Sequence, residues 1–205
     1  MNRNKKIFTF FFVAAFALFA GRVSFAQDQA KPIGDASYEA MLYVVLGSNE
    51  SVPGAELPKN ISGVTRQLRD NFSFSNYRLL NTYVGRIANN GSLEYKSVAT
   101  LQNATDREID SPSFLEWSLN NLRSSEAAPS GDLLVMQMFR FGARVPIKFS
   151  SIVEGGKTLQ TVNYENVGLT VNRLGVTRNS PTLIGTISLP RTAGTVFLVL
   201  SVRPV

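Results

Sequence analysis

Short runs of β-forming residues, separated by Gly, Asn and Pro, fill most of the chain after residue 76 and limit it to a mainly β fold. These runs are residues 77–88, 93–101, 133–141, 143–150, 158–164, 167–171, 183–188 and 195–202. An earlier run, residues 38–46, is apolar at both odd and even positions, as is typical of a strand buried on both faces. Because the chain has no cysteine, packing and not disulfides must stabilise the fold.

One segment has helical periodicity. Its apolar residues recur every three or four positions, at Leu57, Ile61, Val64 and Leu68. Arg66 lies between them and Arg69 follows Leu68, which predicts an amphipathic helix at residues 58–71 with its arginines in solvent. The strands and this helix together predict a mainly β, α+β fold, an antiparallel β-sandwich-like domain.

Residues 114–122 fit two periodicities. Leu115, Trp117 and Leu119 alternate as in a strand, whereas Leu115, Leu119 and Leu122 match a helix. The strand is favoured because no good capping residue precedes the segment.

Two turn features refine the strand pattern. Residues 89–92, Asn-Asn-Gly-Ser, predict a hairpin that pairs residues 77–88 with residues 93–101, because Asn and Gly accept positive φ. Farther on, the apolar positions change from even numbers in residues 158–164 to odd numbers in residues 167–171. This change predicts a β-bulge at residues 165–166.

The N-terminus has the pattern of a secretory signal peptide. Basic residues precede an apolar run of 14 residues, 7–20, and small residues follow, so we expect cleavage after Ala26. Residues 27–35 are then a flexible leader and residues 36–205 a single domain, with a potential subdivision in the polar stretch 102–113. The mature chain is expected to have no transmembrane helix.

Removal of residues 1–26 changes the charge balance. These residues hold four of the 21 basic side chains and none of the 15 acidic ones, so 17 basic and 15 acidic side chains remain. A net charge of +2 gives no electrostatic case for nucleic-acid binding, which requires neutralising many phosphates.

The composition also excludes several chemistries. The chain has neither histidine nor cysteine, which excludes serine–histidine and cysteine–histidine catalysis and histidine-ligated zinc. No catalytic, cofactor-binding or metal-binding residue is therefore predicted, and no cofactor. A hydrolase with paired carboxylates stays open, because such pairs are set by distance in the fold.

Arginines and aromatic residues alternate at residues 139–144. The alternation favours Phe139 and Phe141 in the core, with Arg140 and Arg144 on the opposite face of a strand. A candidate interaction surface combines these two arginines with other exposed or aromatic residues. Its members are Arg140, Arg144, Trp117, Arg66 and Arg69.

The C-terminal third resembles the conserved β core of bacterial secretins, the outer-membrane proteins of secretion and type IV pilus systems. The resemblance covers about residues 140–204. It includes the Gly-Ala-Arg-Val-Pro strand at 142–146, the Val-Asn-Tyr-Glu-Asn-Val-Gly-Leu-Thr-Val strand at 162–171, and closing strands at 183–190 and 195–204. The resemblance implies a secretin-like β fold in the cell envelope, without implying secretion through a pore.

These observations lead to three hypotheses of function. The first is a non-enzymatic exported protein of the periplasm or outer membrane, which assembles with itself or with a secretion or pilus system through exposed strand edges. Membrane association would then be peripheral. The alternative is a secreted β-sandwich that binds carbohydrate or another ligand, with Tyr38, Trp117 and Tyr164 as stacking residues. The third is the carboxylate-dependent hydrolase.

Overall fold

The computed structural model describes the chain from residue 37 to its end, with gaps. The described residues are 37–50, 54–99, 111–125, 132–155, 157–190, 192 and 194–205. They belong to one compact unit, Asp35–Val205. The predicted signal peptide, the leader and most of the polar stretch 102–113 lie outside the described residues.

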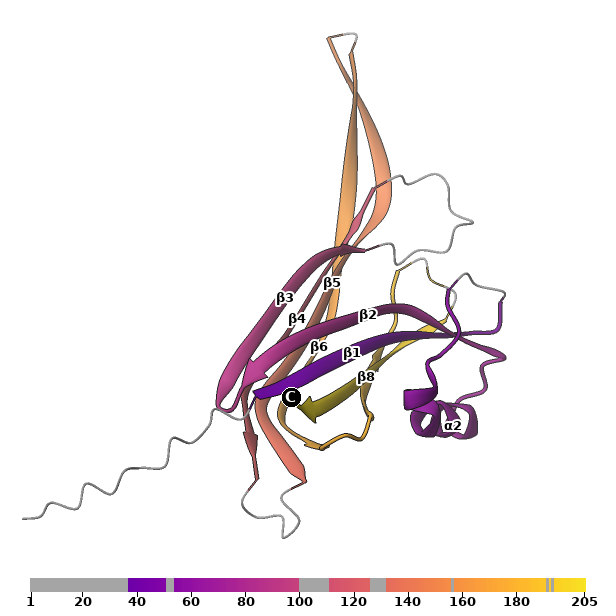
Figure 1. Cartoon of the computed structure of the whole chain (residues 1–205). Helices are drawn as coiled ribbons and strands as arrows, with labels where there is room; N and C mark the ends of the chain where they lie inside the picture. Colours follow the sequence, from indigo (N-terminus) through magenta and orange to yellow (C-terminus); the bar gives the residue numbers. More distant parts are fainter. Residues whose placement is uncertain are drawn as a thin grey trace, which may run out of the picture. The chain divides into compact units, whose positions relative to one another are not determined.

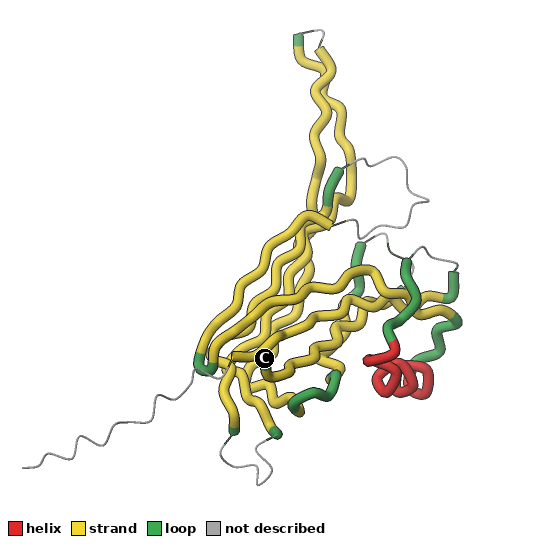
Figure 2. The backbone as a smooth tube through the Cα atoms, in the orientation of Figure 1, coloured by secondary structure: helices red, strands yellow, loops and turns green. Residues whose placement is uncertain are grey.

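The described residues form two antiparallel four-stranded sheets in a sandwich-like arrangement, which confirms the predicted fold class (Figures 1 and 2). Sheet 1 has the order β2-β1-β8-β7 and sheet 2 the order β3-β4-β5-β6. The strands are β1 Ser37–Ser48, β2 Asn76–Ala88, β3 Gly91–Ala99, β4 Ser113–Ser124, β5 Leu133–Glu154, β6 Lys157–Thr177, β7 Thr182–Ile187 and β8 Thr195–Pro204. The strand assignment for residues 114–122 is therefore confirmed.

Sheet 1 is buried on both faces over its central strands, β1 and β8. Even-numbered residues of β1, such as Leu42 and Val44, face sheet 2 in the main core. Odd-numbered residues, such as Tyr43 and Val45, belong to a second core on the opposite face. This two-sided burial explains why residues 38–46 are apolar at both odd and even positions.

The predicted helix is confirmed and covers the second core. It begins with the 3-10 turn η1, Lys59–Ile61, and continues as α2, Ser62–Asn71. Its apolar residues Ile61, Val64 and Leu68 are buried against sheet 1.

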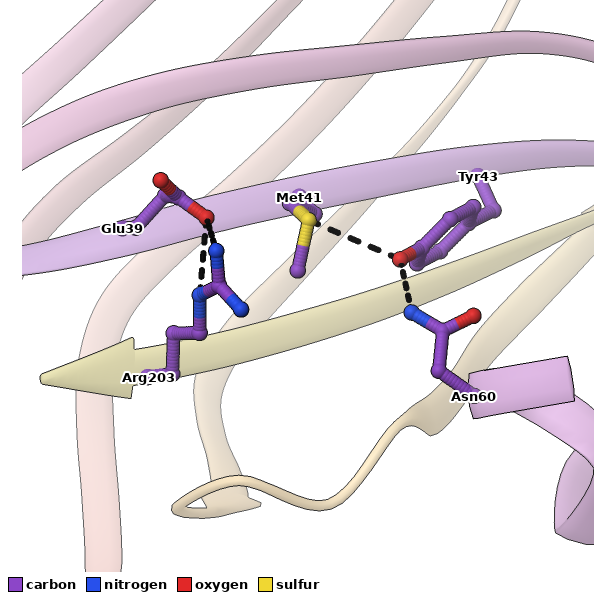
Figure 3. Close-up of polar contacts among 5 residues, drawn as sticks. All are labelled: Glu39, Met41, Tyr43, Asn60 and Arg203. Atoms are coloured by element: carbon purple, nitrogen blue, oxygen red, sulfur yellow. Dashed lines mark hydrogen bonds and ion pairs between the residues drawn. The ribbon is translucent and has the colours of Figure 1, made fainter. Parts of the chain in front are cut away.

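Side chains tie the helix to the sheet at both of its ends. At the first turn, Asn60 Nδ2 donates a hydrogen bond of 2.6 Å to Tyr43 Oη, which in turn donates to Met41 Sδ at 3.5 Å (Figure 3). At the last turn, Tyr77 Oη lies 2.9 Å from the Leu68 carbonyl oxygen and 3.0 Å from that of Phe72. The Leu68 carbonyl also accepts the backbone N–H of Phe72 at 2.9 Å, so the hydroxyl adds a second contact there and contacts the Phe72 carbonyl at the end of the helix.

An ion pair also joins β1 and β8, between Glu39 and Arg203. Arg203 Nε lies 2.8 Å from Glu39 Oε1, and the Arg203 NH2 group contacts the same oxygen at 2.6 Å (Figure 3). Arg203 is more than half exposed, so the pair contributes at most about 1 kcal/mol.

For the hairpin predicted at residues 89–92, the turn is confirmed and the strand pairing is wrong. Residues 89 and 90 do form the turn, and Asn90 has a positive φ of 60°. However, β2 pairs with β1 and β3 pairs with β4, so the turn connects the two sheets. The strands instead pack face to face, with the rings of Tyr83 and Tyr95 5.0 Å apart.

The alternation of core-facing and outward-facing side chains changes phase at one row of residues that crosses three strands of sheet 2. The register aligns Asn121 of β4 with Gln137 of β5 and Arg173 of β6. Asn121 and Arg173 have φ values of 54° and 55°, in the left-handed region that non-glycine residues seldom adopt. Because of this phase change, apolar side chains face the core both before and after the row in each strand. The core residues on either side are Leu119 and Leu122 in β4, and Met136 and Phe139 in β5.

The bulge predicted at residues 165–166 is wrong. Pairing between β5 and β6 is continuous there, and the register shifts at Ile147 of β5 instead. The bulge follows Pro146, which has no backbone N–H for a ladder and is tolerated at such irregularities. Tyr164 consequently lies on the outer face of sheet 2, and the buried part of β5 ends at about Val145.

The described helix is too short and too polar to cross a membrane.

Candidate functional site

The outer face of sheet 2 carries a row of charged residues and glycines. Lys96 of β3, Glu116 of β4, Gly142 of β5 and Gly168 of β6 are consecutive partners in the register. Their neighbours along the strands, such as Trp117 and Phe141, point into the core, so this row faces away from it. Two adjacent glycines leave the middle of the sheet face without side chains.

A groove of about 1000 Å³ lies over this row. We call it the glycine groove. Arg140 and Arg144 flank Gly142 two positions away on either side along β5, and a smaller hollow of about 430 Å³ adjoins the groove at Arg140. The polar, charged and glycine residues that line it are Lys96, Ser97, Glu116, Arg140, Gly142, Arg144, Asn166, Gly168 and Thr170.

An ion pair lies beside the groove on β3. Lys96 Nζ is 2.8 Å from Glu94 Oε1. The hydrogen bond and charge of Lys96 lower the pKa of Glu94, and the charge of Arg140 acts in the same direction. The same hydrogen bond raises the pKa of Lys96, with a smaller contribution from Glu116. Both side chains are therefore ionised at neutral pH.

Aromatic and apolar side chains form the end of the groove toward the tip of the β5–β6 hairpin. The Arg144 guanidinium stacks on the Tyr164 ring, with Cζ 4.7 Å from the ring centroid. The rings of Phe114 and Tyr164 are 5.9 Å apart. Phe114 and Val98 are adjacent in the register and are 41% and 64% exposed, so this end presents apolar surface to solvent.

The structure places the predicted arginine pair on this face. Phe139 and Phe141 are buried in the core, as expected. Arg140 and Arg144 are exposed on the opposite side of β5 and line the groove.

Trp117 is wrong as a member of an interaction surface. Its side chain is 1% exposed and packs between the sheets, because β4 directs its odd-numbered residues to the core. Tyr38, a candidate stacking residue, is also buried, with 3% exposure. Of the three stacking candidates, Tyr164 lies on the outer face of sheet 2.

Arg66 and Arg69 are exposed on α2, as predicted. However, α2 covers the outer face of sheet 1, whereas the glycine groove lies on the outer face of sheet 2. The sandwich therefore separates these two arginines from Arg140 and Arg144, and the five predicted residues do not form one surface.

The described residues contain no cluster of acidic side chains that could hold a metal ion. Glu116 lines the groove, and Glu94 lines the adjoining hollow. A glycosidase-type general acid needs a carboxyl group whose pKa is raised, whereas Lys96 lowers the pKa of Glu94. Glu94 is therefore unsuited to be the general acid.

The sequence alone does not bring Lys96, Glu116 and the two glycines together. A signal for the glycines was present, because glycine within a strand frequently marks a close approach of a ligand or another backbone. Their adjacency depends on pairing between strands, which a single sequence does not specify.

Comparison of the sequence with protein-family models and curated proteins, and of the fold with solved structures, gives no match. The resemblance to secretins stays a prediction.

Proposed function

We propose that this chain is a non-enzymatic, exported protein of the cell envelope whose β domain assembles by strand pairing, with further copies or with components of a secretion or pilus-type system. The observation that carries the proposal is the length of the β5–β6 hairpin. It extends well beyond the ends of its neighbours (Figures 1 and 2).

The outer part of this hairpin is a two-stranded ribbon. We define the ribbon by its paired residues, from Lys148 with Asn163 to Glu154 with Lys157. The last register pair between β4 and β5 is Phe114 with Arg144. Within the described residues, no third strand pairs with the ribbon on either edge.

A two-stranded hairpin is at best marginally stable in water, since it cannot bury a hydrophobic face by itself. The ribbon sequence nevertheless places apolar residues opposite each other in the register, Phe149 with Val162 and Ile152 with Leu159. Open edges of this kind accept strands from other chains. A strand from another molecule would add the third strand that the ribbon needs for stability.

The secretin-like residues 140–204 contain β6, β7, β8 and most of β5, including the whole ribbon. This resemblance supports an envelope location and an assembly role.

Removal of the ribbon tests the proposal. Because Lys148 and Asn163 are register partners, residues 149–162 can be replaced by an Asn-Gly turn. The pairing between the remaining parts of β5 and β6 is then unchanged. The control is Gly155→Asn, which keeps the ribbon and suits the φ of 58° at its tip.

We expect the wild type and the control to sediment as a defined multimer, alone or with outer-membrane vesicles. The ribbon-deleted variant should be monomeric with an unchanged melting temperature, because the sandwich core lies outside the excised segment. A wild type that is monomeric in both conditions, or a deletion variant that still assembles, would overturn the proposal.

A further inference from the structure

The floor of the glycine groove stays open for a physical reason. A β-carbon on Gly142 would lie 3.1 Å from Cγ and Oε1 of Glu116, a flexible side chain that can move aside. A β-carbon on Gly168 would lie 2.5 Å from the carbonyl oxygen of Phe141, which is backbone and cannot. The backbone therefore requires glycine at Gly168, whereas the fold tolerates alanine at Gly142, where the added methyl group would fill part of the floor.

The groove attracts anions. Lys96, Arg140 and Arg144 line it together with Glu116, and Lys96 is paired with Glu94, so the two arginines supply its net positive charge. Arg144 is held in place by its stacking on Tyr164, so less side-chain entropy is lost when it binds an anion. The Cα atoms of Arg140 and Arg144 are about 13 Å apart, from about 3.3 Å per residue along a strand. This spacing fits an elongated ligand with more than one negative charge.

The groove lies on a sheet face and not on a sheet edge. Strands β4 and β5 have a partner on both sides here, so their backbone hydrogen-bonding groups are already used. An extended peptide obtains much of its affinity from main-chain hydrogen bonds at an edge, and this face provides none. A ligand over the floor between β4 and β5 is therefore recognised by side chains, and only the edge strands β3 and β6, at the two sides of the groove, have backbone groups without a partner strand.

We propose that the glycine groove binds an acidic oligosaccharide. The flat glycine floor admits sugar rings, and the exposed ring of Phe114 offers a surface on which a sugar can stack. Arg140 and Arg144 pair with carboxylate or sulfate groups of successive sugars. The Glu116 carboxylate accepts hydrogen bonds from sugar hydroxyls, and Asn166 and Thr170 add donors and acceptors at the far side of the floor.

The first test is calorimetric titration of the purified protein at low salt. The probes are a short oligogalacturonate, a neutral oligogalactan with the same number of rings, and a polyglutamate peptide of equal charge. We expect the oligogalacturonate to bind at least tenfold more tightly than either control, and added salt to weaken its binding. Equal affinity for the neutral sugar, tighter binding of the peptide, or no binding of the oligogalacturonate would overturn the proposal.

The second test uses variants of exposed residues. Arg140→Gln with Arg144→Gln should weaken oligogalacturonate binding at least tenfold, and Gly142→Ala should weaken it by crowding the floor. The matched control, Arg66→Gln with Arg69→Gln, removes the same charge from α2 and should bind as the wild type does. All variants should keep the wild-type melting temperature. An equal loss of affinity in the control would show that net charge, and not the groove, causes binding.

Discussion

Trp117 offers a sharp test of how the two sheets are held together. The indole is 1% exposed in the core between them, near the ring of Tyr95, with centroids 6.4 Å apart. Its Nε1 atom is buried without a hydrogen-bond partner among the described residues. Replacement by alanine removes the packing, whereas replacement by phenylalanine retains most of it and removes the buried N–H group.

The two substitutions should therefore differ strongly in cost. A buried Trp→Ala change costs about 3–5 kcal/mol, a large part of a typical stability of about 5–15 kcal/mol. Trp117→Phe loses the equivalent of roughly two buried CH₂ groups, about 1.6 kcal/mol. Removing the unsatisfied N–H group raises the free energy of unfolding by about 1–3 kcal/mol. We expect the phenylalanine variant to be within about 1 kcal/mol of the wild type.

Urea unfolding followed by far-ultraviolet circular dichroism measures both values. Trp117 is the sole tryptophan of the chain, so its fluorescence cannot serve as a common probe. With an m-value of about 1–3 kcal/mol/M, the alanine variant should shift the midpoint by roughly 1–5 M. A cost below about 1 kcal/mol for alanine would refute the packing of Trp117 between the sheets. A phenylalanine variant as unstable as the alanine variant would show that Nε1 does make a stabilising contact.

Three further predictions concern other parts of the chain. Burial raises the pKa of Tyr83, which is 4% exposed, above its ordinary value of 10.0, so stability should be full below pH 10 and fall as the pH rises through the raised pKa. Tyr83→Phe should flatten that fall in alkaline melting curves. Gly168→Ala should cost about 1–3 kcal/mol by thermal melting through its clash with Phe141, and Gly142→Ala less than about 0.5 kcal/mol. Mass spectrometry of the exported protein should find its N-terminus at Gln27, and an intact Met1 would contradict this.

The predictable parts of the fold are those in which each residue's neighbours along the chain determine its environment. Residues 38–46 are apolar on both faces because β1 has a core on each side, and the helical spacing from Ile61 to Leu68 matches the single face that α2 buries. Both patterns repeat within one element. Local periodicity therefore sufficed for these elements.

Which strands pair with each other could not be predicted from local periodicity. Asn90 adopts the turn conformation that its sequence favours, yet a turn of this kind does not determine whether the following strand joins the same sheet. Tyr83 and Tyr95 pack across the sandwich instead of side by side, with their ring centroids 5.0 Å apart. The glycine groove depends on such pairing in four strands, which is why local alternation placed Arg140 and Arg144 on one face but could not place Gly168 beside Gly142.

The alternation of β5 and β6 shows why a change of phase in one strand is insufficient to place a bulge. The change between Val162 and Val167 suggested one at residues 165–166, but Val162 belongs to the ribbon, beyond the end of the buried core. The real inversion, at Gln137 and Arg173, has a signal repeated in adjacent strands. Strands β4 and β5 have core residues three positions apart, Leu119 with Leu122 and Met136 with Phe139, and the register partners of the second pair in β6 are Leu174 and Val171. A bulge in one strand of a buried sheet disrupts the register unless its neighbours deviate at the same level. Aligned apolar pairs with spacing i, i+3 in successive strands are therefore stronger evidence for an inversion than a phase change in one strand alone.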